Sequence, residues 1–378
     1  MQRIYLDWNA TAPILPEVRD AVVDALEGTP GNASSVHQDG QRARALVEQA
    51  RRDVANAIDA PGQSVVFTGG ATESNNQVLR SHVRRHEEPS VVCTAVEHPS
   101  VLEVVEQLGG EGVETGVIPV DGNGRLDTEW LEGRLDEGVS LVSVMWANNE
   151  IGNVYPVPEI ANLVDAYGAL LHVDATQALG RIPVDFEESG ADIMTLSFHK
   201  MGGPKGIGAI VLREGQKVEA LMAGGHQERG RRPGTENVAA AAGVRSAARA
   251  VASEIDAWKD RLEEKRERFV GRLDEEIADF ELRGDAESRL PNTVNVAFPG
   301  IDGEDFLLAL DLEGVSASSG SACTAGSLEP SHVIEAMGYD HDEARRSVRF
   351  SFGPTTTDDE LDTAADRIAS VVDRLGRL

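Results

Sequence analysis

Three segments of the chain place polar or charged residues directly after apolar runs. In VVFTGGATESNN, two glycines separate an apolar run from a helix-like stretch, so the backbone amides near Ala71 and Thr72 would point at a ligand above the helix N-terminus. LLHVDATQ ends a second run at Asp174, and TLSFHKMGGPKG ends a third at His199 and Lys200. The first segment suits an anion, and the second suits a cation or strong hydrogen-bond donors. The third can supply an amine nucleophile.

Each segment also has an ordinary structural explanation. Corners of this kind between a strand and a helix often bind nothing, and an aspartate before a helix is a common N-cap. The lysine is the most informative of the three features. A lysine at the point where a strand leaves the core can lose its water shell and become a usable nucleophile.

The three segments need a scaffold that brings them together. Between about residues 64 and 212, the uninterrupted apolar runs alternate with helical patterns, which predicts βαβ units and a mainly parallel, buried sheet. The runs are SVVFT, SVVCTAV, LVSVMWA, ALLHVDA, DIMTLSF and GAIVL. Open sheets of this class bind ligands at the carboxyl ends of their strands, so we expect the three segments to converge there.

One cofactor matches this set of groups. Pyridoxal phosphate needs a helix N-terminus for its phosphate, an acid that keeps its ring nitrogen protonated, and a lysine for a Schiff base. A nicotinamide cofactor is disfavoured, because no G-x-G-x-x-G pattern follows the first predicted strand.

The rest of the chain predicts a second, smaller unit. Residues 238–280 are rich in Ala, Arg and Glu and contain no proline, which predicts one long helix that bridges two lobes. PNTVNVAF, SVRFSFG and a final helix in DELDTAADRIASVVDRL then form an α+β unit.

Composition indicates which binding partners are disfavoured and which cellular compartment is expected. The chain has 64 acidic and 35 basic residues and a formal net charge of -29, which disfavours binding to nucleic acid or to an anionic membrane and suits a high-salt cytoplasm. The start, MQRIYLDWNA, has no apolar core of signal-peptide length, and no apolar run approaches the roughly 20 residues of a membrane span. The two cysteines, Cys93 and Cys323, favour a reducing compartment, so we expect a cytoplasmic protein.

The sequence resembles the cysteine desulfurases of the NifS/IscS type, in the class V aminotransferase superfamily. The resemblance runs nearly from end to end, in YLDWNATA, GNASSVHQDGQRAR, FTGGATESNN, EHPSV, NNEIGNVYPV, HVDATQALG, LSFHKMGGPKGIGA, GGHQERGRRPGTENV, SSGSACTAGSLEPSHV and VRFSFG. It implies an α/β protein of PLP fold type I. A large domain at 13–250 would hold a mainly parallel seven-stranded sheet sandwiched by helices. A small α+β domain at 1–12 and 251–378 would carry a loop at about 316–330.

The resemblance also implies roles for single residues. Lys200 would be the Schiff-base lysine, with Lys205 as its only serious competitor. Asp174 would pair with the pyridine nitrogen, Gln177 would bind the ring hydroxyl, and His98 would stack on the ring and shuttle protons. The remaining roles are a phosphate site at Ala71, Thr72, Ser197 and His199, completed by Thr235 of the other subunit of a homodimer, and a substrate site at Asn149 and Arg349. Asn149 would contact the cofactor as well.

Cys323 lies among small residues and glycines in SSGSACTAGSLEP, which indicates an exposed loop, whereas Cys93 lies within an apolar run and suits a buried position. The resemblance makes Cys323 the residue that takes sulfur from L-cysteine as a persulfide, leaving L-alanine. The acceptor would be an iron–sulfur scaffold protein or another sulfur acceptor. No intrinsic metal site is expected, although Cys323 would be the ligand of any cluster held transiently at that interface.

Two alternatives stay open at this point. Another class V enzyme, a selenocysteine lyase or a small-substrate aminotransferase, would leave Cys323 incidental. A protein without catalysis that relays sulfur or binds a scaffold would keep the fold alone.

Overall fold

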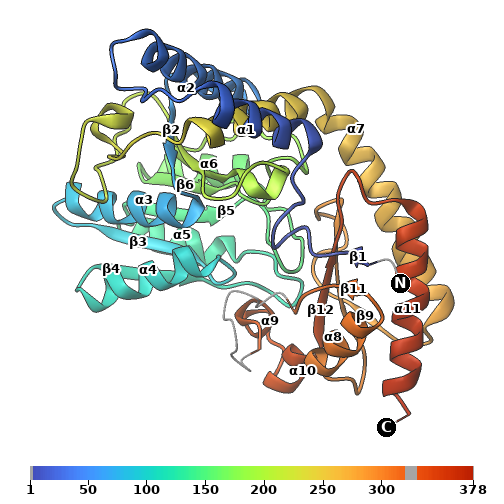
Figure 1. Cartoon of the computed structure of the whole chain (residues 1–378). Coiled ribbons are helices and arrows are strands. Elements are labelled where there is room, and N and C mark those ends of the chain that lie inside the picture. Colours follow the sequence, from blue (N-terminus) through green and yellow to red (C-terminus); the bar gives the residue numbers. More distant parts are fainter. Residues whose placement is uncertain (1–2, 320–329, 378) are drawn as a thin grey trace.

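The computed structural model describes residues 3–319 and 330–377, and Figure 1 shows that they form two lobes of unequal size. A sheet of seven strands fills the larger lobe, in the order β2-β8-β7-β6-β5-β3-β4. The strands are β2 (Val65–Thr68), β3 (Ser90–Thr94), β4 (Glu114–Ile118), β5 (Leu141–Met145), β6 (Leu170–Asp174), β7 (Ile193–Ser197) and β8 (Gly208–Leu212). This α/β architecture confirms the predicted fold class.

Strand direction explains why the site forms at one edge of this sheet. Only β8 runs against the other strands, since it is antiparallel to both β2 and β7. The carboxyl ends of β2, β3, β5, β6 and β7 therefore meet at one edge. Each predicted apolar run became one of the strands. The resemblance implied a seventh strand, but no apolar run located it, because β4 is a half-exposed edge strand.

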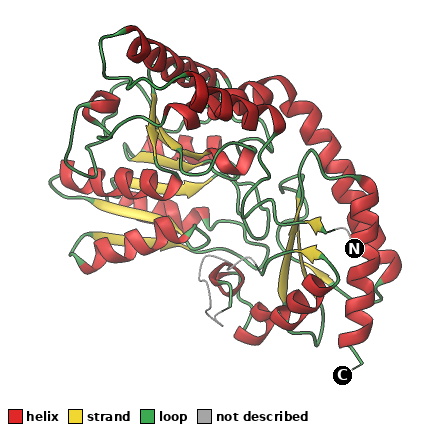
Figure 2. Cartoon of the chain, in the orientation of Figure 1, coloured by secondary structure: helices red, strands yellow, loops and turns green. Residues whose placement is uncertain are grey.

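Helices pack around this sheet, as Figure 2 shows. They are α1 (Pro16–Gly28), α2 (Gln38–Asn56), α3 (Ala71–Arg85), α4 (Pro99–Gly110), α5 (Thr128–Asp136) and α6 (Val157–Ala166), with short 3-10 turns η1 (Phe198–Met201) and η2 (Gln227–Gly230). Helix α3 starts three residues after β2, and α4 starts five residues after β3. These short connections place the N-termini of α3 and α4 at the sheet edge that holds the site.

Helix α7 (Val238–Glu276) is the predicted long helix, and it runs along both lobes (Figure 1). Its first half buries small residues such as Ala240 and Ala247 against α1 and α2. Its second half buries Phe269, which contacts the ring of Phe350 in the small lobe with ring centroids 5.6 Å apart. The division of the chain at residue 250 falls within this helix and stays a prediction.

The small lobe is built around an antiparallel sheet in the order β12-β10-β9. It comprises β9 (Glu281–Leu282), β10 (Thr293–Ala297), α8 (Gly303–Leu312), α9 (His332–Ala336), α10 (His341–Arg345), β12 (Ser347–Ser351) and α11 (Asp358–Leu375), and β1 (Ile4–Tyr5) pairs in parallel with β11 (Val315–Ser316). Within the described ranges, no helix combines the length and the apolar character that crossing a membrane requires.

Candidate active site

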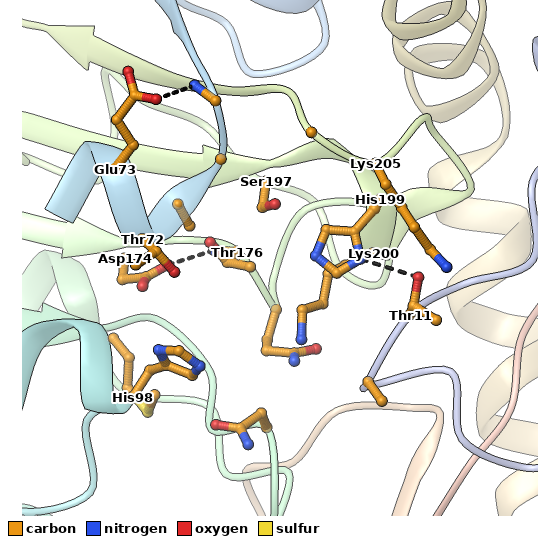
Figure 3. A pocket seen from close by; sticks show the side chains of 18 of the residues that line it. Thr11, Thr72, Glu73, His98, Asp174, Thr176, Ser197, His199, Lys200 and Lys205 are labelled. Carbon is orange, nitrogen blue, oxygen red and sulfur yellow. Dashed lines mark hydrogen bonds between the residues drawn. The ribbon is translucent and has the colours of Figure 1, made fainter. Parts of the chain in front are cut away.

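A cavity of about 810 Å³ lies at the carboxyl ends of the parallel strands (Figure 3). It brings together most of the residues that the sequence singled out. Those lining it are Ala71, Thr72, His98, Asn149, Asp174, Gln177, Ser197, His199 and Lys200, and the competitor Lys205 lines it as well.

Two glycines shape the turn between β2 and α3. Gly70 has a φ of 148°, a conformation that favours glycine, and it precedes the first residue of α3. Across the sheet edge, a Cβ on Gly208 would lie 2.7 Å from the Cα of Gly70 and 2.6 Å from the carbonyl oxygen of Leu196. Glycine at both positions lets β8 run directly against the turn. The first amides of α3 thereby border the cavity, as an anion site requires.

Asp174 ends β6 and is only 5% exposed. Its carboxylate accepts hydrogen bonds from the Nδ2 of Asn75 at 2.8 Å and from the backbone N–H of Thr176 at 2.9 Å. A buried carboxylate is stable when donors of this kind satisfy it. Asp174 faces the same space as Lys200 in Figure 3.

Lys200 lies in η1, directly after β7. Its Nζ donates a hydrogen bond to the carbonyl oxygen of Asn9 at 2.5 Å, and the side-chain amide of Gln177 donates to the same oxygen at 3.0 Å. The Oε1 of Gln177 and the Oγ1 of Thr176 are buried and have no hydrogen-bond partner among the described residues. A polar ligand in the cavity would satisfy both atoms.

Two histidines complete the polar lining. Burial lowers the pKa of His98, and the nearby charge of Asp174 acts in the opposite direction. Burial, and after it the charge of Lys200, lowers the pKa of His199 to about 4. His199 is therefore neutral near pH 7, and its Nδ1 lies 3.1 Å from the hydroxyl of Thr11.

Two of the predicted residues that the structure describes do not line this cavity. Arg349 on β12 is buried; it donates to the carboxylate of Asp7 at 2.6 Å and to the carbonyl oxygen of Asn149 at 2.9 Å, so it reaches the site through Asn149. Thr235 lines a neighbouring cavity of about 260 Å³ that shares Gly206 with the first. Cys323 lies outside the described residues.

The sequence did not reveal the part played by the N-terminal segment. Asn9 is fully buried, and its carbonyl oxygen accepts the hydrogen bond from Lys200. Its side-chain amide donates to the carbonyl oxygen of Asn149 at 3.1 Å. The preceding carbonyl in the chain, that of Trp8, accepts a hydrogen bond from the buried Arg181 at 3.3 Å. The YLDWNATA motif was the available signal, but a role for main-chain carbonyls leaves no mark on side-chain types.

The other sequence prediction about cysteine is confirmed. Cys93 is fully buried in β3, and burial raises the pKa of its thiol well above the ordinary value. Among the described residues, no group of three or more His, Cys, Asp or Glu side chains is placed to hold a metal ion.

Pyridoxal phosphate fits the donors and acceptors that face the cavity. The amides of α3 suit its phosphate, Asp174 suits a protonated ring nitrogen, Gln177 and Thr176 have buried polar atoms to satisfy, and Lys200 supplies the amine. A parallel sheet with this set of groups at its carboxyl edge defines an enzyme that depends on this cofactor.

Comparison with known proteins narrows the class. The profile of the aminotransferase class-V family matches residues 4–363. A cysteine desulfurase of Trichormus azollae is 42% identical over all of this chain and 95% of its own length. The cysteine desulfurase NifS of Azotobacter vinelandii is 41% identical, over 99% of this chain and 94% of its own.

Solved structures agree with these relatives. A NifS-like protein, 32% identical, superposes with a TM-score of 0.92 over 99% of this chain and all of its own. The chain therefore belongs to the class V aminotransferase family, among its cysteine desulfurases.

Proposed function

We propose that this protein removes sulfur from L-cysteine, releases L-alanine and passes the sulfur to an acceptor through Cys323. One observation carries the chemistry: the amine of Lys200 lies in the same cavity as the buried carboxylate of Asp174 and the first turn of α3. Its relatives at about 40% identity carry the name cysteine desulfurase.

In this proposal several residues would each hold one part of the cofactor. Lys200 would attach it covalently, Asp174 would pair with the ring nitrogen, and Gln177 would bind the ring hydroxyl. The phosphate would be bound by Ala71, Thr72, Ser197 and His199, together with Thr235 from the second subunit of a homodimer. When bound, pyridoxal phosphate withdraws electrons from the α-carbon of an amino acid and weakens the bonds around it.

The protein's own groups bind the substrate and move its protons and sulfur. Arg349 and Asn149 orient the carboxylate of L-cysteine, because a guanidinium forms strong charge-assisted hydrogen bonds with a carboxylate. Lys200 carries the α-proton. The Cys323 thiolate forms a bond to the substrate sulfur as the carbon–sulfur bond breaks, the electron pair stays on carbon, and a proton completes L-alanine.

The acceptor and the compartment are further parts of the proposal. The loop sequence SSGSAC...PSHV favours a role in iron–sulfur cluster assembly, with a scaffold protein as the acceptor. A cluster held transiently at that interface would use Cys323. The presence of only two cysteines supports a cytoplasmic location.

The direct test mixes the purified holoenzyme with L-cysteine and a reductant and assays sulfide and alanine together. Equal amounts are expected, whereas pyruvate or the absence of sulfide would defeat the proposal. Lys200→Ala should lose all activity, while Lys205→Ala, a matched change in the same cavity, should keep most of it.

Two further measurements separate the alternatives. Cys323→Ser should abolish persulfide transfer, but a transaminase would keep its activity in this variant. Borohydride reduction followed by peptide mass spectrometry should locate the cofactor on Lys200. An adduct on Lys205, or none, would contradict the assignment.

A further inference from the structure

We propose that Asn75 and Ser100 are positioning residues that keep the proton of neutral His98 on Nε2, so that His98 presents a hydrogen-bond donor, and not a base, to the cavity. The inference deepens the proposed function, since the importance of His98 rests on the cavity being the active site. The observation behind it is a chain of hydrogen bonds that links Asp174 to His98 through buried residues behind the cavity lining.

The carboxylate of Asp174 determines which atoms donate and which accept in this chain of hydrogen bonds. Asn75 is fully buried on α3, and the atom that it places 2.8 Å from Asp174 must be its amide nitrogen, because a carboxylate only accepts hydrogen bonds. The same nitrogen donates its second hydrogen to the Oγ of Ser100 at 2.9 Å. Asn75 therefore has a fixed orientation and uses both amide hydrogens.

Ser100 accepts a hydrogen bond from Asn75 and donates one to His98. Because its Oγ accepts from Asn75, its own hydroxyl proton is available for the Nδ1 of His98, which lies 2.8 Å away. The backbone N–H of Ser100 also donates to this Nδ1, at 3.1 Å, as part of the N-cap of α4. Two donors thus face Nδ1, so this nitrogen carries no proton and the proton of the neutral ring is on Nε2.

At the other end of this chain of hydrogen bonds, the donors and acceptors are fixed in the same way. The Oδ1 of Asn75 accepts from the hydroxyl of Thr195 at 2.6 Å, so the Thr195 oxygen accepts from the Nε2 of His172 at 3.1 Å. The Nδ1 of His172 then accepts from the hydroxyl of Ser143 at 2.8 Å. All of these residues are fully buried, and burial lowers the pKa of His172 to about 4, which fits a neutral ring.

This arrangement has a consequence for the ligand. His98 lines the cavity with its ring, and Figure 3 shows it on the same side as Asp174. Because Nδ1 accepts from Ser100, the proton of the ring is on Nε2, so any ligand atom that meets Nε2 must be an acceptor. In this proposal Lys200 alone removes a proton from the substrate, which replaces the proton-shuttling role that the resemblance implied for His98.

The test reads the tautomer directly. In holoenzyme labelled with ¹⁵N at its nine histidines, long-range N–H correlation spectra near pH 7 report which ring nitrogens are protonated, and His98→Gln and His172→Gln assign the signals. We expect an unprotonated Nδ1 and a protonated Nε2 in both rings. A proton on the Nδ1 of His98, alone or in an imidazolium, would overturn the proposal.

Ser100→Ala tests the relay, because it removes the hydroxyl and keeps the backbone N–H. The Nδ1 signal of His98 should move toward the average of the two tautomers, and sulfide release should slow roughly fivefold, the effect of one lost hydrogen bond. The matched control is Ser143→Ala, at the far end of the chain, which should shift His172 and leave His98 unchanged.

The remaining outcomes are also decisive. An unchanged His98 signal in Ser100→Ala, or equal changes in both serine variants, would overturn the role of Asn75 and Ser100. A wild-type enzyme that releases no sulfide would defeat the proposed function, but the tautomer would still be measured independently.

Discussion

Glu97, the neighbour of His98, is a carboxylic acid that the protein keeps away from water. Its Oε1 accepts from the backbone N–H of Met145 at 2.6 Å and from the hydroxyl of Thr94 at 2.9 Å, while its Oε2 is buried without a partner among the described residues. Burial, and after it the charge of Asp174, raises the pKa of Glu97 to about 8. The side chain therefore keeps its proton at neutral pH.

This raised pKa predicts a dependence of stability on pH. Because the unfolded chain loses this proton near pH 4.5 and the folded protein near pH 8, the contribution of Glu97 is complete below pH 4.5 and is lost as the pH rises to about 8. Glu97→Gln imitates the protonated acid and lacks this loss. Relative to wild type, the variant should gain stability between pH 5 and pH 8, by about 1.4 kcal/mol for each pH unit at most.

Urea unfolding of both proteins at pH 5 and pH 8 measures the difference, and comparison at each pH cancels the titration of other groups. A constant difference between the two proteins at both pH values would show that Glu97 ionises in the folded state as it does in the unfolded chain.

At the level of the secondary-structure elements, the contact between the start of β8 and the turn before α3 controls the anion site. Gly208→Ala puts a methyl group less than 3 Å from backbone atoms of Gly70 and Leu196, so the turn must move. We expect about 1–3 kcal/mol lower stability and a roughly tenfold weaker affinity for pyridoxal phosphate, the effect of losing one charge-assisted hydrogen bond to the phosphate.

Gly110→Ala is the matched control for this change. It lies at the end of α4, where an added methyl group meets nothing within 4 Å, and it should leave cofactor affinity unchanged and slightly raise stability. Affinity is measured by titrating the cofactor-free protein and following its absorbance. Equal affinities in the two variants would rule out the close contact as a determinant of the site.

The elements show how far the sequence could predict this structure. Continuous apolar runs identified the buried strands, and the absence of proline identified α7, because both signals are local. Asp174 and Lys200 were predicted to lie at one edge of the sheet because each stands at or directly after the end of such a run. Contacts between distant segments were not predicted: Asn9 with Lys200, and Asp7 with Arg349, join residues that only the folded chain brings together.

For the whole molecule, the proposed homodimer can be tested by complementation. If Thr235 serves the site of the partner subunit, a heterodimer of one Lys200→Ala chain and one Thr235→Ala chain contains one complete site. It should show about half the wild-type activity per dimer, with normal cofactor affinity at that site. Differently tagged chains allow its purification. Weak cofactor binding in this heterodimer would mean that Thr235 serves its own chain.

The net charge of -29 makes a second prediction at this scale. Many ion pairs on the surface, such as Arg268 with Asp362, are partly exposed and contribute little, so mutual repulsion of the excess carboxylates dominates the effect of salt. We expect the Tm to rise by several degrees between 0.1 M and 2 M KCl, as scanning calorimetry would show. A falling Tm would mean that the ion pairs outweigh the repulsion.

The segment that holds Lys200 has a consequence for biosynthesis. The backbone N–H of Asn9 donates to the hydroxyl of Ser351, and the carboxylate of Asp7 accepts a hydrogen bond from Arg349, so both residues have partners that are translated 342 residues later. A nascent chain released before β12 would expose an unfinished pocket. Capture of vitamin B6 should therefore wait until β12 has been synthesised and has folded against this segment.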